Sequence, residues 1–452
     1  MLKILKKLFF NDYIFCSVFV ASLLGLISII PINHELTDPF GQALGDFEVT
    51  DLAFTTLRID KTESDSGAFS SLRPVVPEAD TNIVIVNLGY AGNAEMAAII
   101  NNLNEFQPAV IGINRLIEKS GDDFADSLLK EALSSTKKLV LISRLTGKSK
   151  NELSWTDVKK PDKSIIPQNN NTIVAYNNLL TTDRDFKTTR HFIPQTNFKG
   201  QLQSFFPVEL VKATYPEKAR EFISREKEIE VINYLGNLDK FYSIDVEQAL
   251  NKEFDPGIIK NKIVILGYLG ESLSSEKFWD TDKYYTPMNK KYAGKTFPDM
   301  FETVIYANVV SQVLSNEHIN VVSPFVDFIL NLIVCFLNVV IFSRLFHAAA
   351  VWWDTLSIVI TLIEIVLLLV ITTLIFGLFN IEINLNFSIV FVLVLGSFLE
   401  LYYGLFKIAL QKFSVKYLIL QETNKRDELK DIMSGSTRDI LIDPFSNQKK
   451  KK

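Results

Sequence analysis

Three long apolar runs lie in the C-terminal part of this chain, and a fourth lies close to its N-terminus. A helix needs about 20 mainly apolar residues to cross the hydrocarbon core of a bilayer. The four runs are each close to that length and occupy 13–30, 325–346, 355–379 and 385–408. The sequence therefore predicts an α-helical bundle of four membrane spans, with 31–323 forming a separate domain outside the bilayer.

The first run has an alternative interpretation, because a cleaved signal peptide is also apolar. Its apolar stretch, YIFCSVFVASLLGLISII, exceeds the about 7–15 residues usual for such a peptide, and no small-x-small cleavage site follows. We therefore expect this run to be retained as a membrane anchor.

Positive charges beside the runs predict their orientation, since lysine and arginine concentrate in cytoplasmic loops. Segment 1–12 carries three lysines, Arg344 lies near the loop before the third run, and the tail 409–452 is basic. The loop at 380–386 has no lysine or arginine. We therefore expect both termini in the cytoplasm and 31–323 on the outer side.

The cysteines indicate the compartment of the outer domain. Cys16 and Cys335 are the only two in the sequence, and both lie inside apolar runs. The outer domain therefore has no disulfide and no thiolate metal site, which is common in the bacterial periplasm. We predict a periplasmic domain on a bacterial inner membrane. Its net negative charge argues against nucleic acid as a partner.

The outer domain is expected to be α/β with a mostly parallel sheet. Six apolar runs are predicted strands: 83–87, 110–114, 139–143, 173–177, 229–233 and 262–267. Continuous rather than alternating apolar character indicates a sheet covered on both faces. Helices are predicted at 95–106, 123–133 and 202–213, at 37–60 leading in from the membrane, and at 298–316 leading back. The polar segment 144–170 is predicted to be a surface excursion.

Several segments, taken in order, resemble the CHASE2 family of extracytoplasmic sensor domains. They include DFEVTDLAFTTLR (46–58), EVINYLGNLDKFYSIDVEQAL (230–250), NKIVILGYLGES (261–272) and YTPMN (285–289), the last followed by VIYANVVSQVLSN (304–316). The resemblance covers roughly 40–410, and the family's arrangement is one span, the domain, then three spans. It implies an extracytoplasmic sensing role.

The sequence departs from the family pattern at the predicted strand ends, at 92–94, where the family's tryptophan-proline-arginine is absent, and after the last span. The family usually has aspartates at the ends of its first two strands, where this chain has Asn87 and Asn114. The family normally carries a kinase or cyclase after its last span. The roughly 40 residues that follow here contain no histidine and no glycine-rich phosphate loop. We therefore expect no fused output enzyme and no enzymatic activity.

A candidate ligand crevice lies beyond the carboxyl ends of the predicted strands, where open parallel sheets bind ligands. This position would bring together Asn87, Asn114, Arg115, Arg144 and Gly267. The alternative is that the two asparagines hydrogen-bond to the backbone of local turns.

A second candidate is the acidic and aromatic loop from Asp280 to Pro287, in which Tyr285 and Thr286 are candidate ligand-binding residues. Its carboxylates, Asp280 and Asp282, could hold a cation such as Ca²⁺, although a solvated loop explains them as well. The four histidines are far apart in sequence. We therefore predict no metal site and no cofactor.

Charged residues also occur inside the predicted spans, where a carboxylate costs roughly 2.5–3.5 kcal/mol on insertion scales. Glu364 lies in the third run and Glu400 in the fourth, with Lys407 near the end of the fourth. They are interpreted as polar contacts within the bundle or to another membrane protein. A proton pathway is the other interpretation. It would need a relay of several such groups, and the predicted spans contain these two carboxylates.

These patterns predict an inner-membrane sensing or docking protein that works through a separate partner. That partner would be a protein in the periplasm, membrane or cytoplasm, or a second copy of the chain. The alternative is a structural subunit of a larger cell-envelope complex that senses no ligand.

Overall fold

The computed structural model describes residues 2–29, 48–57, 78–148, 155–167, 171–180, 188–274, 280, 282–289 and 297–406. The chain divides into two compact units. One consists of 32–323 together with 369–383, and the other consists of 1–31, 324–368 and 384–452.

A seven-stranded sheet forms the centre of the first unit, with strand order β10-β1-β11-β2-β3-β4 and with β5 also paired to β3. All the pairs are parallel except β3 with β4. The strands are β1 (Asp80–Asn87), β2 (Val110–Asn114), β3 (Leu139–Lys148), β4 (Trp155–Lys159), β5 (Thr172–Tyr176), β10 (Phe241–Ile244) and β11 (Ile263–Gly267).

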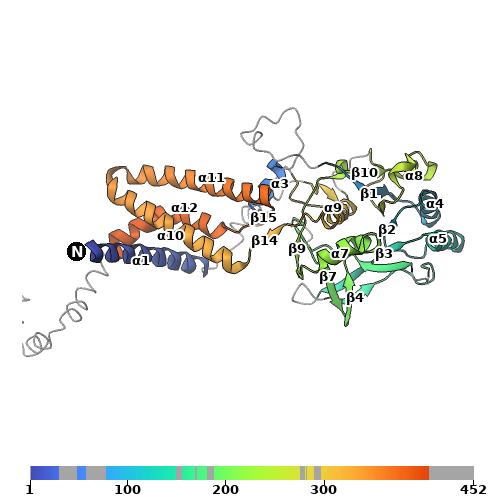
Figure 1. The fold of residues 1–452 in the computed structure, drawn as a ribbon, viewed down its shortest axis with the longest axis horizontal. Coiled ribbons are helices and arrows are strands. Elements are labelled where there is room, and N and C mark those ends of the chain that lie inside the picture. The colour runs from blue at the N-terminus through green and yellow to red at the C-terminus, as the bar shows by residue number, and fades with distance from the viewer. Residues whose placement is uncertain are drawn as a thin grey trace, which may run out of the picture. The chain divides into compact units, whose positions relative to one another are not determined.

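Helices cover both faces of this sheet, which explains the continuous apolar strands (Figure 1). Side chains of β1 alternate between two cores: Ile83 and Ile85 pack in one, and Val84 and Val86 in the other. The helices on the first face are α6 (Phe206–Thr214) and α9 (Glu302–Ser315), and those on the second are α4 (Asn93–Asn104), α5 (Asp123–Ser135) and α8 (Val246–Asn251). The predicted α/β class with a mostly parallel sheet is therefore confirmed.

Short elements complete the unit. The helices are α3 (Asp51–Leu57) and α7 (Pro216–Ile223). Four two-stranded ladders pair β6 (His191–Phe192) with β9 (Glu230–Val231), β7 (Gln195–Phe198) with β8 (Gln201–Ser204), β12 (Lys283–Tyr284) with β13 (Met300–Phe301), and β14 (Asn320–Val321) with β15 (Ile381–Glu382). β15 follows helix α11 (Trp353–Phe379) in the chain.

Three predictions of local structure are wrong in part. The run 229–233 is no strand of the main sheet, because only β9 forms there and it pairs with β6. The edge strand next to β1 is β10 instead. Its four residues are too few to show a clear alternation of apolar and polar side chains in the sequence. The helix predicted at 202–213 begins only at Phe206, because β8 occupies the residues before it. The segment 144–170, predicted to be a surface excursion, contains the strand β4.

The second unit is helical. It contains α1 (Leu2–Ile29), α10 (Pro324–Ala348), the first part of α11, and α12 (Asn386–Leu401), which continues as a π-helical turn, Tyr402–Phe406. Among the residues that the structure describes, three helices are long and apolar enough to cross a membrane: 324–348, 353–379 and 386–405. The apolar part of α1 is shorter, 12–26, so a fourth span remains a prediction. Val20, Val339 and Leu395 belong to the core where α1, α10 and α12 pack together.

Candidate functional site

The carboxyl edge of the main sheet brings the predicted crevice residues into one row. Asn87 at the end of β1 is in register with Gly267 of β11, and Gly267 is in register with Asn114 of β2. The prediction that these three positions are neighbours is therefore correct. Whether they face an open crevice depends on the contacts of their side chains.

Asn87 is fully buried and holds the turns around it. Its Nδ2 donates to Oδ1 of Asp245 at 2.9 Å and to the carbonyl oxygen of Gly270 at 3.1 Å. Its Oδ1 accepts from the backbone N–H groups of Gly89 and Leu269, both at 2.9 Å. Since both ends of the amide are engaged, Asn87 joins β1, β11 and the start of α8.

Asn114 is bound to the first turn of α9. Its Nδ2 donates to Oε2 of Glu302 and to Oγ1 of Thr303, both at 3.1 Å. Its Oδ1 accepts from Nδ2 of Asn177 at 3.2 Å. At Gly267 an added Cβ would lie only 2.1 Å from Oγ1 of Thr303. The first residues of α9 therefore fill the edge of the sheet where parallel α/β folds bind ligands.

The two arginines at the strand ends face different partners. Arg115 donates to the carbonyl oxygen of Ala91, in the loop between β1 and α4. Arg144 has a half-exposed side chain that approaches Oε2 of Glu302 at 4.0 Å. Burial raises the pKa of Glu302, which the nearby Arg144 guanidinium partly opposes. Arg144 and Asn114 thus both contact the buried carboxyl group of Glu302, which the chain itself supplies.

Tyr285 and Thr286 belong to a separate turn. The carbonyl oxygen of Tyr285 accepts from the backbone N–H of Thr189 at 2.7 Å. Thr286 is buried, and its backbone N–H and Oγ1 donate to the two carboxylate oxygens of Asp299, at 2.9 and 2.5 Å. Burial raises the pKa of Asp299 to about 7, against the hydrogen bonds from Thr286, which lower it. Thr286 therefore stabilises the turn at 285–287 through its hydrogen bonds to Asp299.

The two carboxylates singled out in the apolar runs differ in their contacts. Oε1 of Glu400 accepts from Nε1 of Trp353 at 2.6 Å, which joins α12 to the start of α11. Glu364 lies on α11, and its Oε2 is buried without a hydrogen-bond partner among the residues that the structure describes. Lys407 lies outside the described residues. Asn331 of α10 provides a polar contact that the sequence analysis missed, since its Oδ1 accepts from Ser388 Oγ at 2.6 Å.

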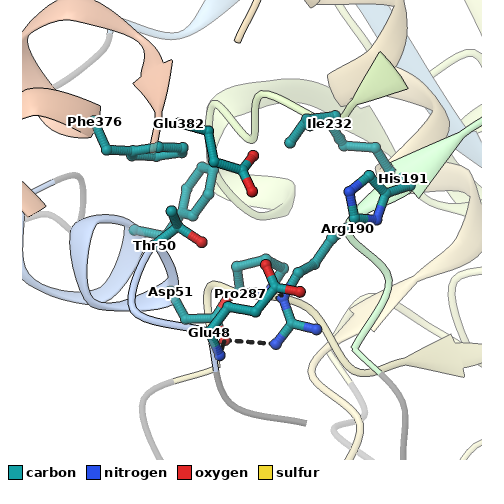
Figure 2. Close-up of a pocket in the computed structure, with 11 residues that line it drawn as sticks. Glu48, Thr50, Asp51, Arg190, His191, Ile232, Pro287, Phe376 and Glu382 are labelled. Carbon is teal, nitrogen blue, oxygen red and sulfur yellow. Dashed lines mark hydrogen bonds and ion pairs between the residues drawn. The ribbon is translucent and has the colours of Figure 1, made fainter. Parts of the chain in front are cut away.

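A second site lies around Arg190 and was not predicted as a site. We call it the Arg190 cavity, and Figure 2 shows it. Its lining residues are Glu48, Thr50, Asp51, Phe54, Arg190, His191, Val231, Ile232, Pro287, Phe376 and Glu382. The cavity volume is about 10 Å³, which is room for about one water molecule.

Several parts of the chain meet at the Arg190 cavity. Asp51 and Phe54 lie on α3, which follows α1 in the sequence. Arg190 directly precedes β6, and His191 in β6 is in register with Val231 of β9. Phe376 lies on the last turn of α11 and Glu382 in β15. The rings of Phe54 and Phe376 are in edge contact, with centroids 5.2 Å apart.

A buried ion pair dominates the electrostatics of this cavity. Nε and Nη2 of Arg190 donate to the two carboxylate oxygens of Asp51, at 2.9 and 2.6 Å. The side chains are 9% and 4% exposed. Oε2 of Glu48 lies 3.6 Å from Nε of the same guanidinium. Burial and the positive charge of Arg190 lower the pKa of His191, which favours a neutral ring.

Sequence reasoning missed the carboxylates that bind the predicted residues. Asp245, Asp299 and Glu302 are 158, 13 and 188 positions from Asn87, Thr286 and Asn114 respectively. Asp51 lies in 46–58, one of the segments that resemble the family, and Arg190 lies outside the segments given above. A separation of 139 positions gives no sign that they pair.

Comparison with known families agrees with the resemblance seen in the sequence. The model of the CHASE2 domain matches residues 78–342, which is more than half of the chain. No curated protein matches the chain, and no solved structure does. The matched region includes the whole seven-stranded sheet, α9 and most of α10. The chain therefore belongs to the CHASE2 family of extracytoplasmic sensor domains.

Proposed function

We propose that this protein is an inner-membrane sensing or docking protein whose outer domain passes its conformational state to the membrane helices, and that it acts through a separate protein. On this proposal both termini are cytoplasmic and α1 is a fourth span. The chain has no catalytic role of its own. The outer domain recognises a small envelope component or another protein.

One observation carries this proposal: the loop between α11 and α12 is hydrogen-bonded to the end of the sensor domain. Asn320 and Val322 donate from their backbone N–H groups to the carbonyl oxygens of Asn380 and Glu382, at 2.8 and 3.1 Å. β14 leads directly into α10, and β15 lies between α11 and α12. A change in this ladder therefore acts on the ends of three helices at once, which is the kind of helix shift used in signalling.

The same ladder supports the predicted orientation. The pairing of β14 with β15 fits a topology in which the loop at 380–383 and the domain share one side of the membrane. Such a topology has an even number of crossings between them, which agrees with the charge pattern.

A structural subunit of a larger envelope complex is the second candidate. The filled carboxyl edge of the sheet favours it, because Glu302 and Thr303 of α9 occupy the position where a small ligand would otherwise bind. A protein partner needs no such crevice and can dock on the outside of the domain.

Purification of the full-length protein from its native membrane in mild detergent distinguishes the two. Co-purification of a kinase, cyclase or transcriptional regulator, with activity altered by Val322→Pro, would support signalling through a partner. A stoichiometric envelope assembly without a regulator would establish the structural role and reject sensing.

If the protein purifies alone, a thermal-shift screen of envelope-derived small molecules on the full-length chain decides about ligand sensing. A ligand present at 100 times its Kd should stabilise the folded domain by about 2.7 kcal/mol. Absence of any stabilising ligand, together with absence of a regulator, would count against the sensing proposal.

A further inference from the structure

Helix α11 contributes little to the core of the helical unit. That core is formed mainly by α1, α10 and α12. Among the described residues of α11, Trp353 belongs to the core and Ile360 packs partly buried against it. Much of the rest of the helix in this unit presents large apolar side chains outward. They include Ile358, Val359, Leu362, Ile363, Val366 and Leu367. In a bilayer, either lipid or another membrane helix covers such side chains.

One face of α11 is turned toward the other helices. Trp353, Ser357 and Thr361 recur on that face at helical spacing, and all three are buried. A Cβ added at Gly396 of α12 would lie 3.5 Å from Cβ of Ser357, so the two helices approach closely there. Glu364 continues the same face but is only half-buried. The described part of the chain therefore covers this face incompletely at Glu364.

The carboxyl group of Glu364 lacks a partner among the residues that the structure describes. Its Oε2 is buried and makes no hydrogen bond to them. Glu400 of α12 differs, because its Oε1 accepts from Nε1 of Trp353 at 2.6 Å. A carboxylate inside the hydrocarbon is costly and usually faces a partner or a water-filled cavity. Glu364 is therefore the position on α11 where a further group would be stabilising.

The interior of this chain's own apolar runs offers no positive charge to Glu364. The runs 13–30 and 355–379 contain no lysine or arginine. Arg344 and Lys407 lie within the last few residues of their runs, whereas Glu364 lies near the middle of α11. A symmetric contact with a second copy would bring two Glu364 side chains together and would supply no positive charge. The charge pattern therefore favours a different protein.

We propose that α11 binds a membrane helix of another protein at Glu364, and that a lysine or arginine inside that helix pairs with the carboxylate. Ionisable residues within membrane helices commonly pair with one another. The basic group neutralises Glu364, and the partner helix packs against the neighbouring apolar side chains of α11. This inference rests on the proposed action through a separate protein, and it adds where that protein binds and which group it uses.

A synthetic membrane helix tests this pairing directly. The probe is a peptide of about 20 leucines with one central lysine, and an all-leucine peptide is its control. The full-length protein carries a fluorescent donor in phosphatidylcholine vesicles, and energy transfer measures the binding of each acceptor-labelled peptide. This lipid has no net charge, so it does not attract the lysine. The parent protein should bind the lysine peptide about tenfold more tightly, as expected for one polar contact in a bilayer.

Two substitutions assign the preference to Glu364. Glu364→Gln should lose most of it, because glutamine has nearly the same size but no charge. Glu400→Gln is the matched control and should keep the preference, since Glu400 is also a carboxylate in an apolar helix but already accepts from Trp353. Glu364→Lys should reverse the preference, so that a peptide with a central glutamate binds more tightly than the lysine peptide. Circular dichroism first checks that each variant is folded.

Equal binding of the lysine and all-leucine peptides by the parent protein would overturn the proposal. So would a preference that survives in Glu364→Gln, or one that Glu400→Gln loses to the same extent. A failure to find a partner in native membranes would count against the proposed function and leave the peptide result unchanged. A negative peptide result would leave the proposed function intact, because that proposal does not specify where the partner docks.

Discussion

Asn87 donates a hydrogen bond from Nδ2 to Oδ1 of Asp245 at 2.9 Å, linking the end of the first strand to a carboxylate 158 positions away. Asn114 has the same relation to Glu302, at 3.1 Å. At both strand ends an amide of this chain faces a carboxylate. Aspartate at either position would place two carboxylates together, so the amides fit these partners.

Asn87→Asp should therefore destabilise the outer domain by at least about 1–3 kcal/mol at pH 8, because a buried donor is replaced by a charge that repels Asp245. Protonation of either carboxyl group relieves the repulsion, so the loss should shrink as the pH falls toward 5. Thermal unfolding of the purified full-length protein at several pH values measures it. Asn82→Asp is the control, because Asn82 also donates to a carboxylate, Asp80, but at an exposed site. Equal losses for the two variants would contradict the prediction.

Gly267→Ala should clash with α9. The added Cβ would lie 2.1 Å from Oγ1 of Thr303, and overpacking of this kind costs typically about 1–3 kcal/mol. Thr303→Ala removes that oxygen and should restore part of the stability lost in Gly267→Ala. The melting temperatures of the two single variants and the double variant measure this coupling.

Gly92→Ala serves as the control for this pair, because the nearest atom to its added Cβ is 4.0 Å away. It should change stability little. If the Gly267→Ala and Thr303→Ala effects simply add, α9 does not fill the sheet edge as described.

His318 should make the domain less stable in acid. Burial, assisted by Arg225, lowers the pKa of His318 to about 4, below its ordinary value of 6.5. The folded state therefore favours the neutral ring, and the stability due to it is fully present above pH 6.5 and lost as the pH falls toward 4. His318→Gln should show a smaller drop in melting temperature between pH 7.5 and 5 than the parent protein. An equal drop in both proteins would assign the acid sensitivity to another group.

Val322→Pro should loosen the ladder between β14 and β15. Proline has no N–H, and the N–H of Val322 donates to the carbonyl oxygen of Glu382 at 3.1 Å. Hydrogen exchange in 380–383 should become faster, with a loss of about 0.5–1.5 kcal/mol for one hydrogen bond. Val322→Ala keeps the N–H and is the matched control. Unchanged exchange in the proline variant would remove the main support for coupling through this loop.

Features that depend on local spacing could be predicted from the sequence alone. Ile99, Ile100 and Leu103 recur at the period of a helix and are all buried in α4. The unbroken apolar run of β11 predicted a strand covered on both faces, and each of its residues is buried. The long C-terminal apolar runs correspond to three helices able to cross a membrane. Elements of two to four residues, such as β9 and β10, contain too few side chains to show a period.

Which polar groups are partners depends on how the chain is folded. The strand-end rule placed Asn87, Gly267 and Asn114 in one row correctly, since parallel register is a property of the sheet. It could not foresee that α9 fills the edge, nor that Arg190 meets Asp51 across 139 positions. Hydrogen bonds and ion pairs act over about 3 Å in space, and position along the chain has no effect on them. Such pairs become visible only when the folded chain brings the two groups together.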